Sequence, residues 1–204
     1  MTKITALALS LLTATAMTAC GDKTPDNQII APKADTPTAT STQTQPVAPD
    51  PAKMMSRSFP LMNASGNQIG NVIIKDVANG VDFTVKSSSL IEGTSAIHFH
   101  ETGSCEGPAF TSAGGHYNPT GVMHGKDTST GPHAGDMENI DVPVSGMVDV
   151  TRTNTKVSLV GRDGLPALLD TNGSAFIIHA GADDYKSQPS GAAGSRIACA
   201  VIAD

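Results

Sequence analysis

The sequence predicts an all-β domain over residues 56–204, built as a Greek-key barrel or sandwich. Many short apolar segments in this region are separated by turns rich in glycine and proline, and no stretch carries a long helical period. The segments 72–74 and 81–85 flank Asn79-Gly80, a pair of residues typical of a tight β-hairpin turn. About 150 residues are the size of one domain, so we expect a single core.

The remaining elements follow in chain order. His98-Phe99-His100 is typical of a strand, in which both histidines point to the same face because side chains alternate. The glycines and prolines between 114 and 136 indicate an irregular loop. Apolar patterns predict further strands at 147–150 and 156–160, and a late strand at 175–179 that ends at a histidine.

All six histidines fall at spacings typical of metal ligands, and with one aspartate they can be sorted into two adjoining sites. Neutral imidazole binds borderline metals strongly near neutral pH. Three histidines and a carboxylate satisfy tetrahedral zinc. If His116 uses both ring nitrogens, a copper site is formed by His98, His100, His116 and His179. A zinc site is then formed by His116, His124, His133 and Asp136.

Five segments in this order resemble the copper/zinc superoxide dismutases. They are IHFHE at 97–101, GGHYNP at 114–119, GPHAGD at 131–136, IHAGADD at 178–184 and GSRIAC at 194–199. The ordered set spans about residues 56 to 204, which makes coincidence a poor explanation. The resemblance implies a flattened eight-stranded Greek-key β-barrel with two long loops over the metals.

The same resemblance implies an enzyme that dismutates superoxide to dioxygen and hydrogen peroxide with a redox-cycling copper and a structural zinc. In such a site His116 is the imidazolate shared by both metals, and it takes up and returns a proton. Asp183 corresponds to the buried carboxylate that hydrogen-bonds to ligands of both metals. Cys105 and Cys199 correspond to the intrachain disulfide of the family.

Positive charge near the substrate is the next expectation. Arg196 corresponds to the arginine beside copper that attracts the anionic substrate, and Lys186 is the only basic residue between His179 and that arginine. The net charge is −6 and no basic cluster is present, which argues against a nucleic-acid partner. Attraction of superoxide must therefore be local.

Two other classes of function compete with an enzyme. A carrier that delivers or buffers metal at the cell envelope would use methionine- or cysteine-rich sites for Cu(I), and Met54-Met55 is too small a cluster for that. A structural relic of the fold would have lost copper ligands, whereas all four are present. Both classes are weaker hypotheses than dismutation. The sequence does not choose between a monomer and a homodimer.

The amino-terminal region predicts export. Lys3 precedes an apolar run at 4–17 that is too short for a permanent membrane span, so residues 1–20 have the character of a signal peptide. Small residues before Cys20 resemble the bacterial lipoprotein signal, in which the cysteine is lipidated; plain secretory cleavage near Ala19 is the alternative. Residues 21–55 predict a Pro/Thr-rich disordered tether. We expect a lipid-anchored protein on the periplasmic face of the outer membrane.

Overall fold

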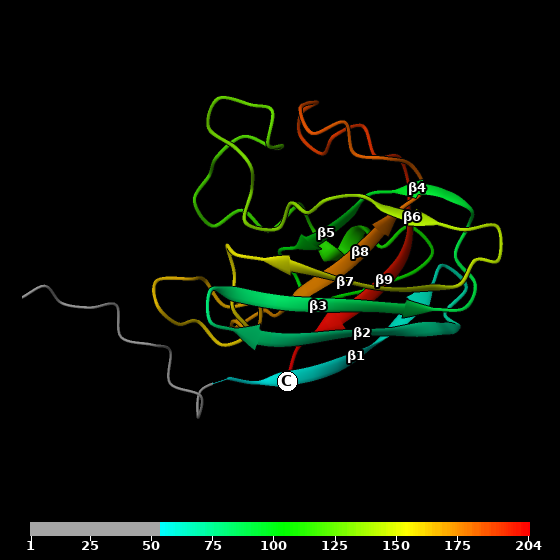
Figure 1. Cartoon of the computed structure of the whole chain (residues 1–204), viewed down its shortest axis with the longest axis horizontal. Helices are drawn as coiled ribbons and strands as arrows, with labels where there is room; N and C mark the ends of the chain where they lie inside the picture. The colour runs from blue at the N-terminus through cyan, green and yellow to red at the C-terminus, as the bar shows by residue number, and fades with distance from the viewer. Residues whose placement is uncertain (1–53) are drawn as a thin grey trace, which may run out of the picture. The chain divides into compact units, whose positions relative to one another are not determined.

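The structure is a computed structural model, and it describes residues 54–204 (Figure 1). The predicted signal peptide at 1–20, Cys20 and the tether as far as residue 53 lie outside the described residues. Within the described range, none of the helices has the length and apolar character needed to cross a membrane.

The described chain is built from nine antiparallel strands and one short 3-10 helix, η2 (Thr111–Ala113). The strands are β1 (Ser56–Asn63), β2 (Gln68–Val77), β3 (Gly80–Ser87), β4 (Gly93–Ser95), β5 (Ile97–His100), β6 (Ile140–Val142), β7 (Val148–Asn154), β8 (Ser174–His179) and β9 (Arg196–Ile202). Seven of them form one sheet in the order β5-β8-β9-β1-β2-β3-β7, and β4 pairs with β6. The predicted all-β class and the hairpin of β2 and β3 are confirmed.

The strand count of nine is compatible with the eight strands predicted. β4 and β5 are separated by Ala96 alone, and this residue continues the pairing with the chain next to β8. Its N–H donates to the carbonyl of Gly181 at 2.8 Å, and its carbonyl accepts the N–H of His179 at 2.9 Å. Residues 93–100 are thus one bent strand that pairs with β6 at its start and with β8 at its end.

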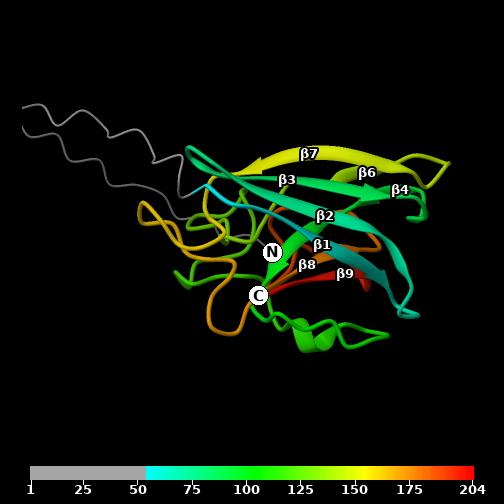
Figure 2. The ribbon, with the colours of Figure 1, turned by 90° about the horizontal axis from the view of Figure 1, so that it is seen from below.

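The large sheet curls on itself (Figure 2). Three buried aromatic rings pack together in its core. Phe83 of β3 packs against Phe99 of β5 and Phe176 of β8, with ring centroids 5.9 and 5.8 Å apart. Side chains alternate along a strand, so Phe99 occupies the core while His98 and His100 project to the other face of β5. That face is the one available to a metal site, and all three side chains are buried.

The strand predicted at 156–160 is wrong. Only Ser158 makes an isolated bridge, to Ala167, and the rest of the segment is loop. Val157 and Leu159 are fully buried and join the core cluster. The N–H of Leu159 is bound by the buried carboxylate of Asp76 at 3.0 Å rather than by a neighbouring strand. The apolar alternation is therefore satisfied by a loop packed onto the core.

Two long connections leave the sheet at its β5 and β8 ends: residues 101–139 between β5 and β6, and residues 180–195 between β8 and β9. We call them the first loop and the second loop. In Figure 1 their green and orange-red traces rise above the strands. Both loops contribute residues of the predicted site.

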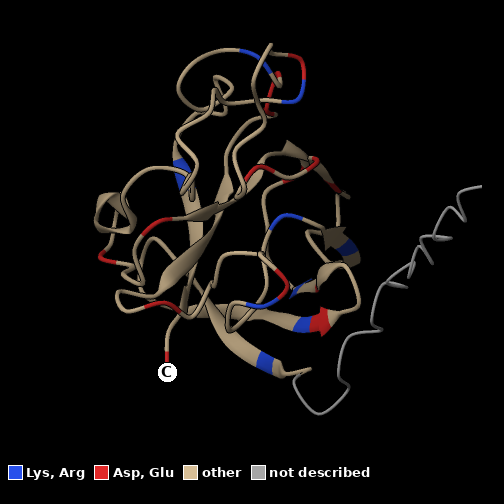
Figure 3. Ribbon diagram, turned by 90° about the vertical axis from the view of Figure 1, so that its left-hand side faces the viewer, with Lys and Arg blue, Asp and Glu red and all other residues tan. Residues whose placement is uncertain are grey.

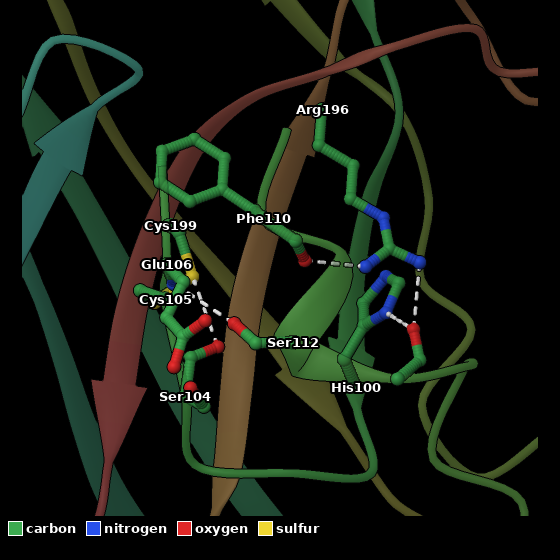
Figure 4. Close-up of a disulfide and its surroundings, with 9 residues drawn as sticks. His100, Ser104, Cys105, Glu106, Phe110, Ser112, Arg196 and Cys199 are labelled. Atoms are coloured by element: carbon green, nitrogen blue, oxygen red, sulfur yellow. Dashed lines mark hydrogen bonds between the residues drawn. A yellow bond between two sulfur atoms is a disulfide. The ribbon is translucent and has the colours of Figure 1, made fainter. Parts of the chain in front are cut away.

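The predicted disulfide is confirmed between Cys105 of the first loop and Cys199 of β9, with Cα atoms 5.8 Å apart (Figure 4). The bond joins positions 94 residues apart in the sequence. In the chain-entropy model, closing a loop of that length stabilises the fold by about 4 to 5 kcal/mol. The bond also ties the start of the first loop to the strand that begins at Arg196.

Candidate metal centre

The first loop reaches the histidines of β5 through a few backbone hydrogen bonds. The carbonyl of Phe99 accepts the N–H of Tyr117 at 2.8 Å, and the N–H of Phe99 donates to the carbonyl of Gly135 at 2.9 Å. These contacts set His116 beside His100 and Asp136 beside His98. A side chain at Gly135 could not be accommodated, because its Cβ would lie 2.3 Å from the carbonyl oxygen of Phe99.

Four buried histidines form the first group, and their candidate ligand atoms lie within 4.8 Å of one another: His98, His100, His116 and His179. Each has one buried ring nitrogen with no hydrogen-bond partner, namely Nδ1 of His98 and Nε2 of the other three. Buried polar atoms without partners are costly, and converging nitrogens are even more so. The arrangement has the chemistry of a metal site with four imidazole ligands.

The other ring nitrogens fix the orientation of these imidazoles. Nδ1 of His100 donates to the carbonyl of Gly114 at 3.0 Å, and Nδ1 of His179 donates to the carbonyl of Gly194 at 3.2 Å. A carbonyl oxygen can only accept, so the proton of each ring sits on Nδ1. The lone pair of each Nε2 is therefore free to bind a metal.

The second group surrounds the carboxylate of Asp136. Its Oδ1 lies 2.9 Å from Nδ1 of His116 and 3.2 Å from Nδ1 of His133, and its Oδ2 lies 3.0 Å from Nδ1 of His124. Backbone N–H groups of Gly125 and His133 also donate to Oδ2, at 2.8 and 3.0 Å. Three imidazole nitrogens and one carboxylate thus face one another, which is a donor set suited to tetrahedral zinc.

His98 and His133 both lie near this second group. The candidate ligand atoms of His98, His116, His124 and Asp136 also fall within 4.8 Å of one another. The ring of His98 stacks on that of His116 with centroids 3.8 Å apart, which brings its single free nitrogen close to both groups. Nδ1 of His133 is likewise buried and without a hydrogen-bond partner.

Asp183 of the second loop connects the two groups. Its Oδ2 lies 2.9 Å from Nε2 of His98 and its Oδ1 lies 3.0 Å from Nε2 of His124. The carboxylate is buried, as the sequence comparison with the family implied. Gly191 permits this packing: a Cβ there would lie 1.8 Å from Oδ1 of Asp183, and its φ of +68° also favours glycine.

Burial keeps three histidines of the first group uncharged. It lowers the pKa of His98 to about 3, of His100 to about 2 and of His179 to about 4. At neutral pH these rings are uncharged and can coordinate a metal without first losing a proton.

In the second group the two histidines His124 and His133 differ, since burial lowers the pKa of His133. Burial acts to lower the pKa of His124, but hydrogen bonds to Asp136 and Asp183 outweigh it and raise the value to about 9. Burial acts to raise the pKa of both carboxyls, and hydrogen bonds from histidines hold both well below their usual range. Both carboxylates are therefore charged at neutral pH, which favours a divalent cation among them.

Arg196 lies at the edge of the first group (Figure 4). Its guanidinium donates to the carbonyls of Phe110 and Gly114, each at 2.6 Å. The Gly114 carbonyl also accepts a hydrogen bond from Nδ1 of His100. One backbone oxygen therefore connects Arg196 to a histidine of the first group. Lys186, by contrast, is exposed on the second loop, and its backbone rather than its ammonium group makes the contacts described there.

Two polar residues of this region were missed at the sequence level. Asn139 hydrogen-bonds to the backbone of Asp183, and Gln188 hydrogen-bonds to the backbone of His124. Both are carboxamides in loops of ordinary composition, and no spacing or neighbour distinguishes them in the sequence.

The sequence is similar to one family of known proteins. The model of the family described as "Copper/zinc superoxide dismutase (SODC)" matches residues 68–202. The chain is 37% identical over 198 residues to the superoxide dismutase-like protein YojM of Bacillus subtilis, covering 96% of this chain and 94% of that protein. It is 43% identical over 143 residues to superoxide dismutase [Cu-Zn] 2 of Aquifex aeolicus, covering 70% of this chain and 83% of that protein.

A solved structure extends the similarity to three dimensions. A double mutant of a SOD-like protein from Bacillus subtilis matches with a TM-score of 0.69 and 42% sequence identity. The match covers 72% of this chain and 97% of that chain.

Proposed function

The chain belongs to the copper/zinc superoxide dismutase family, and from this premise we propose which residues hold each metal and what they do in the reaction. As a member of the family the protein is an oxidoreductase that dismutates superoxide, with copper and zinc as its cofactors.

Copper is assigned to the first group, His98, His100, His116 and His179, and zinc to His116, His124, His133 and Asp136. The observation that carries the assignment is the set of buried ring nitrogens without hydrogen-bond partners. Four of them converge in the first group, whereas the remaining nitrogen of His116 faces Asp136 together with Nδ1 of His124 and His133. His116 alone presents one nitrogen to each group, which supports its role as the bridge.

His98 goes to copper and His133 to zinc for a reason of geometry. His98 has one nitrogen committed to Asp183, so it can serve one metal only. It lies next to His100 on the same strand face, and without it the copper group would keep three histidines. His133 has its Nδ1 within 3.2 Å of the zinc carboxylate, and it is a member of no other group.

Copper, when bound, supplies one-electron redox chemistry, so that one superoxide is oxidised to dioxygen and the next is reduced to peroxide. The chain relays one of the two protons that the reaction consumes, after taking it up from solvent. Nε2 of His116 is the atom at which a proton can be held, because Nδ1 stays beside Asp136 and keeps the ring in place. From Nε2 the proton is donated toward peroxide, and the second proton comes from solvent.

Arg196 supplies the fixed positive charge. Basic residues are dispersed among acidic ones over the described domain (Figure 3), so the overall field does not favour an anion. A guanidinium held by two carbonyls beside His100 provides attraction at the reaction centre itself.

The function is tested by metal analysis and a superoxide-consumption assay on the same preparation. We expect about one copper and one zinc per chain and rapid consumption of superoxide, since both donor sets are complete. A protein that holds zinc alone after copper reconstitution and consumes no superoxide would refute the catalytic assignment and favour a role in zinc binding.

We also place the protein in the cell envelope. The proposal has three parts: a signal peptide at 1–20, a lipid on Cys20, and a tether at 21–55 that joins the anchor to the domain at 56–204. The Cys105–Cys199 disulfide supports export, because such bonds persist in oxidising compartments. Dismutation at the periplasmic face of the outer membrane would protect the envelope from superoxide.

The anchor is tested by changing Cys20 to alanine. The variant should appear as a soluble exported protein or as an unprocessed precursor, with the activity of the folded domain unchanged because Cys20 precedes that domain. Mass spectrometry of the wild-type amino terminus provides the direct measurement. An unmodified cysteine, or a mature terminus beyond residue 20, would exclude lipidation.

A further inference from the structure

Gln188 of the second loop holds the backbone of His124 in the first loop. Its side-chain oxygen accepts the N–H of His124 at 2.9 Å, and its side-chain nitrogen donates to the carbonyl of His124 at 3.0 Å. One carboxamide therefore satisfies both backbone groups of this residue. The same nitrogen also donates to the carbonyl of Lys186 at 2.9 Å, which orients the amide within its own loop.

Asn139 makes the reverse connection. Its side-chain oxygen accepts the N–H of Asp183 at 2.9 Å, and its side-chain nitrogen donates to the carbonyl of Asp183 at 3.0 Å. A residue next to β6 thus holds the second loop, while Gln188 of the second loop holds the first. The two residues that are held, His124 and Asp183, hydrogen-bond to each other through their side chains at 3.0 Å.

The hydrogen bonds to Gln188 have no substitute in the described structure. His124 is fully buried, and among the backbone hydrogen bonds of residues 54–204 its N–H and carbonyl have no partner. Buried backbone groups need a partner, so loss of the Gln188 amide leaves two unsatisfied groups unless the loop moves or water enters. Movement of the loop would shift the His124 ring relative to Asp136, and water in place of the amide would leave its backbone less firmly held.

We propose that Gln188 is a positioning residue for zinc, acting through the backbone of His124. This inference rests on the proposed zinc site. Partners outside the ligand shell orient metal ligands, and their loss commonly weakens metal binding by about 10- to 100-fold. Because Gln188 lies on the second loop, zinc binding and the order of that loop stabilise each other.

The experiment measures zinc affinity in copper-free full-length protein by competition with a chelator. Gln188→Ala should bind zinc about 10-fold or more weakly than the wild type. Gln68→Ala is the matched control, because Gln68, at the exposed start of β2, also makes two side-chain hydrogen bonds, and neither of them involves the metal groups. Its zinc affinity should equal that of the wild type.

Two further measurements separate positioning from a general loss of structure. The absorption spectrum of Co(II) bound in place of zinc should change in Gln188→Ala and stay unchanged in Gln68→Ala. If Gln188→Ala does not fold, Gln188→Asn, which keeps the amide but shortens its reach, should show the same loss of zinc affinity. If the Gln188 variant has the zinc affinity and Co(II) spectrum of the wild type, the positioning role of Gln188 is refuted and the zinc site is not. If the wild type itself binds no zinc, the proposed zinc site is refuted as well.

Discussion

Replacing His100 by alanine should abolish dismutation, lowering the rate of superoxide consumption by about 100-fold or more. Losses of that size follow even when only a partner outside the ligand shell is removed, and His100 belongs to the shell itself. Its Nε2 is one of the four buried nitrogens of the first group, and its Nδ1 is held by Gly114. Copper content should fall with the rate, because three imidazoles and a cavity would remain.

Zinc content is the informative control for this variant. His100 makes no contact with Asp136, so zinc should remain near one per chain. The matched substitution, His133→Ala, removes the same side chain from the second group and should release zinc while most copper stays bound. Under the proposed assignment, elemental analysis should find that His100→Ala loses copper and keeps zinc, and that His133→Ala loses zinc and keeps most of its copper.

Two outcomes would contradict the assignment. If His100→Ala kept full copper and full activity, the first group would not be the copper site. If His133→Ala kept its zinc, then His98 rather than His133 would complete the zinc group, as its proximity to His116 and Asp136 allows.

Reversing the charge of Arg196 should also slow the enzyme strongly. Electrostatic steering by charges near a site changes association rates by about 10- to 1,000-fold, and superoxide is an anion whose encounter with such enzymes limits turnover. We therefore expect Arg196→Glu to lower the rate by about 10-fold or more while copper and zinc contents stay near normal. Lys186→Glu should have a smaller effect, because Lys186 is exposed and its described hydrogen bonds are made by its backbone.

The structure adds a second consequence of losing Arg196. The guanidinium shares the Gly114 carbonyl with His100, so a change of side chain also removes two hydrogen bonds from the first loop. Arg196→Lys separates the two effects, since it keeps the charge but not the planar pair of donors. This variant should retain most of the rate if steering dominates.

Salt dependence provides an independent measurement. The rate of the wild type should fall as ionic strength rises, because the Debye length is about 10 Å at 0.1 M salt. The dependence should weaken or reverse in Arg196→Glu. Full activity with normal copper in that variant would assign Arg196 a structural role only.

The fold class followed from local patterns, and the exceptions are instructive. Apolar patterns identified parts of β2, β3, β7 and β8, and the spacing of His98 and His100 identified β5. Both faces of β5 and β8 are buried, so these two strands do not alternate between buried and exposed residues. The segment 156–160 has an alternating apolar pattern, yet it forms a loop because Asp76 and the core bind its polar and apolar groups in place of a neighbouring strand. Alternation reports burial of every second residue, and a loop packed on a core can satisfy it.

For the site, the sequence by itself determined the chemical inventory: six histidines, Asp136, Asp183, Arg196 and two cysteines, all in the order of a known family. It could do so because ligand identity is a property of residue type and, within a strand, of spacing. The pairing of the cysteines is confirmed, while the assignment of each ligand to a metal stays a prediction.

Only the tertiary structure decided which nitrogen of each ring is free and which residues hold the ligands in place. Asp183 meets His98 and His124 across 85 and 59 residues of sequence, and Gln188 meets His124 across 64. Such contacts depend on how two irregular loops pack against each other. No periodicity encodes them, because a loop's conformation is set by the partners that satisfy its backbone rather than by a repeating geometry of its own.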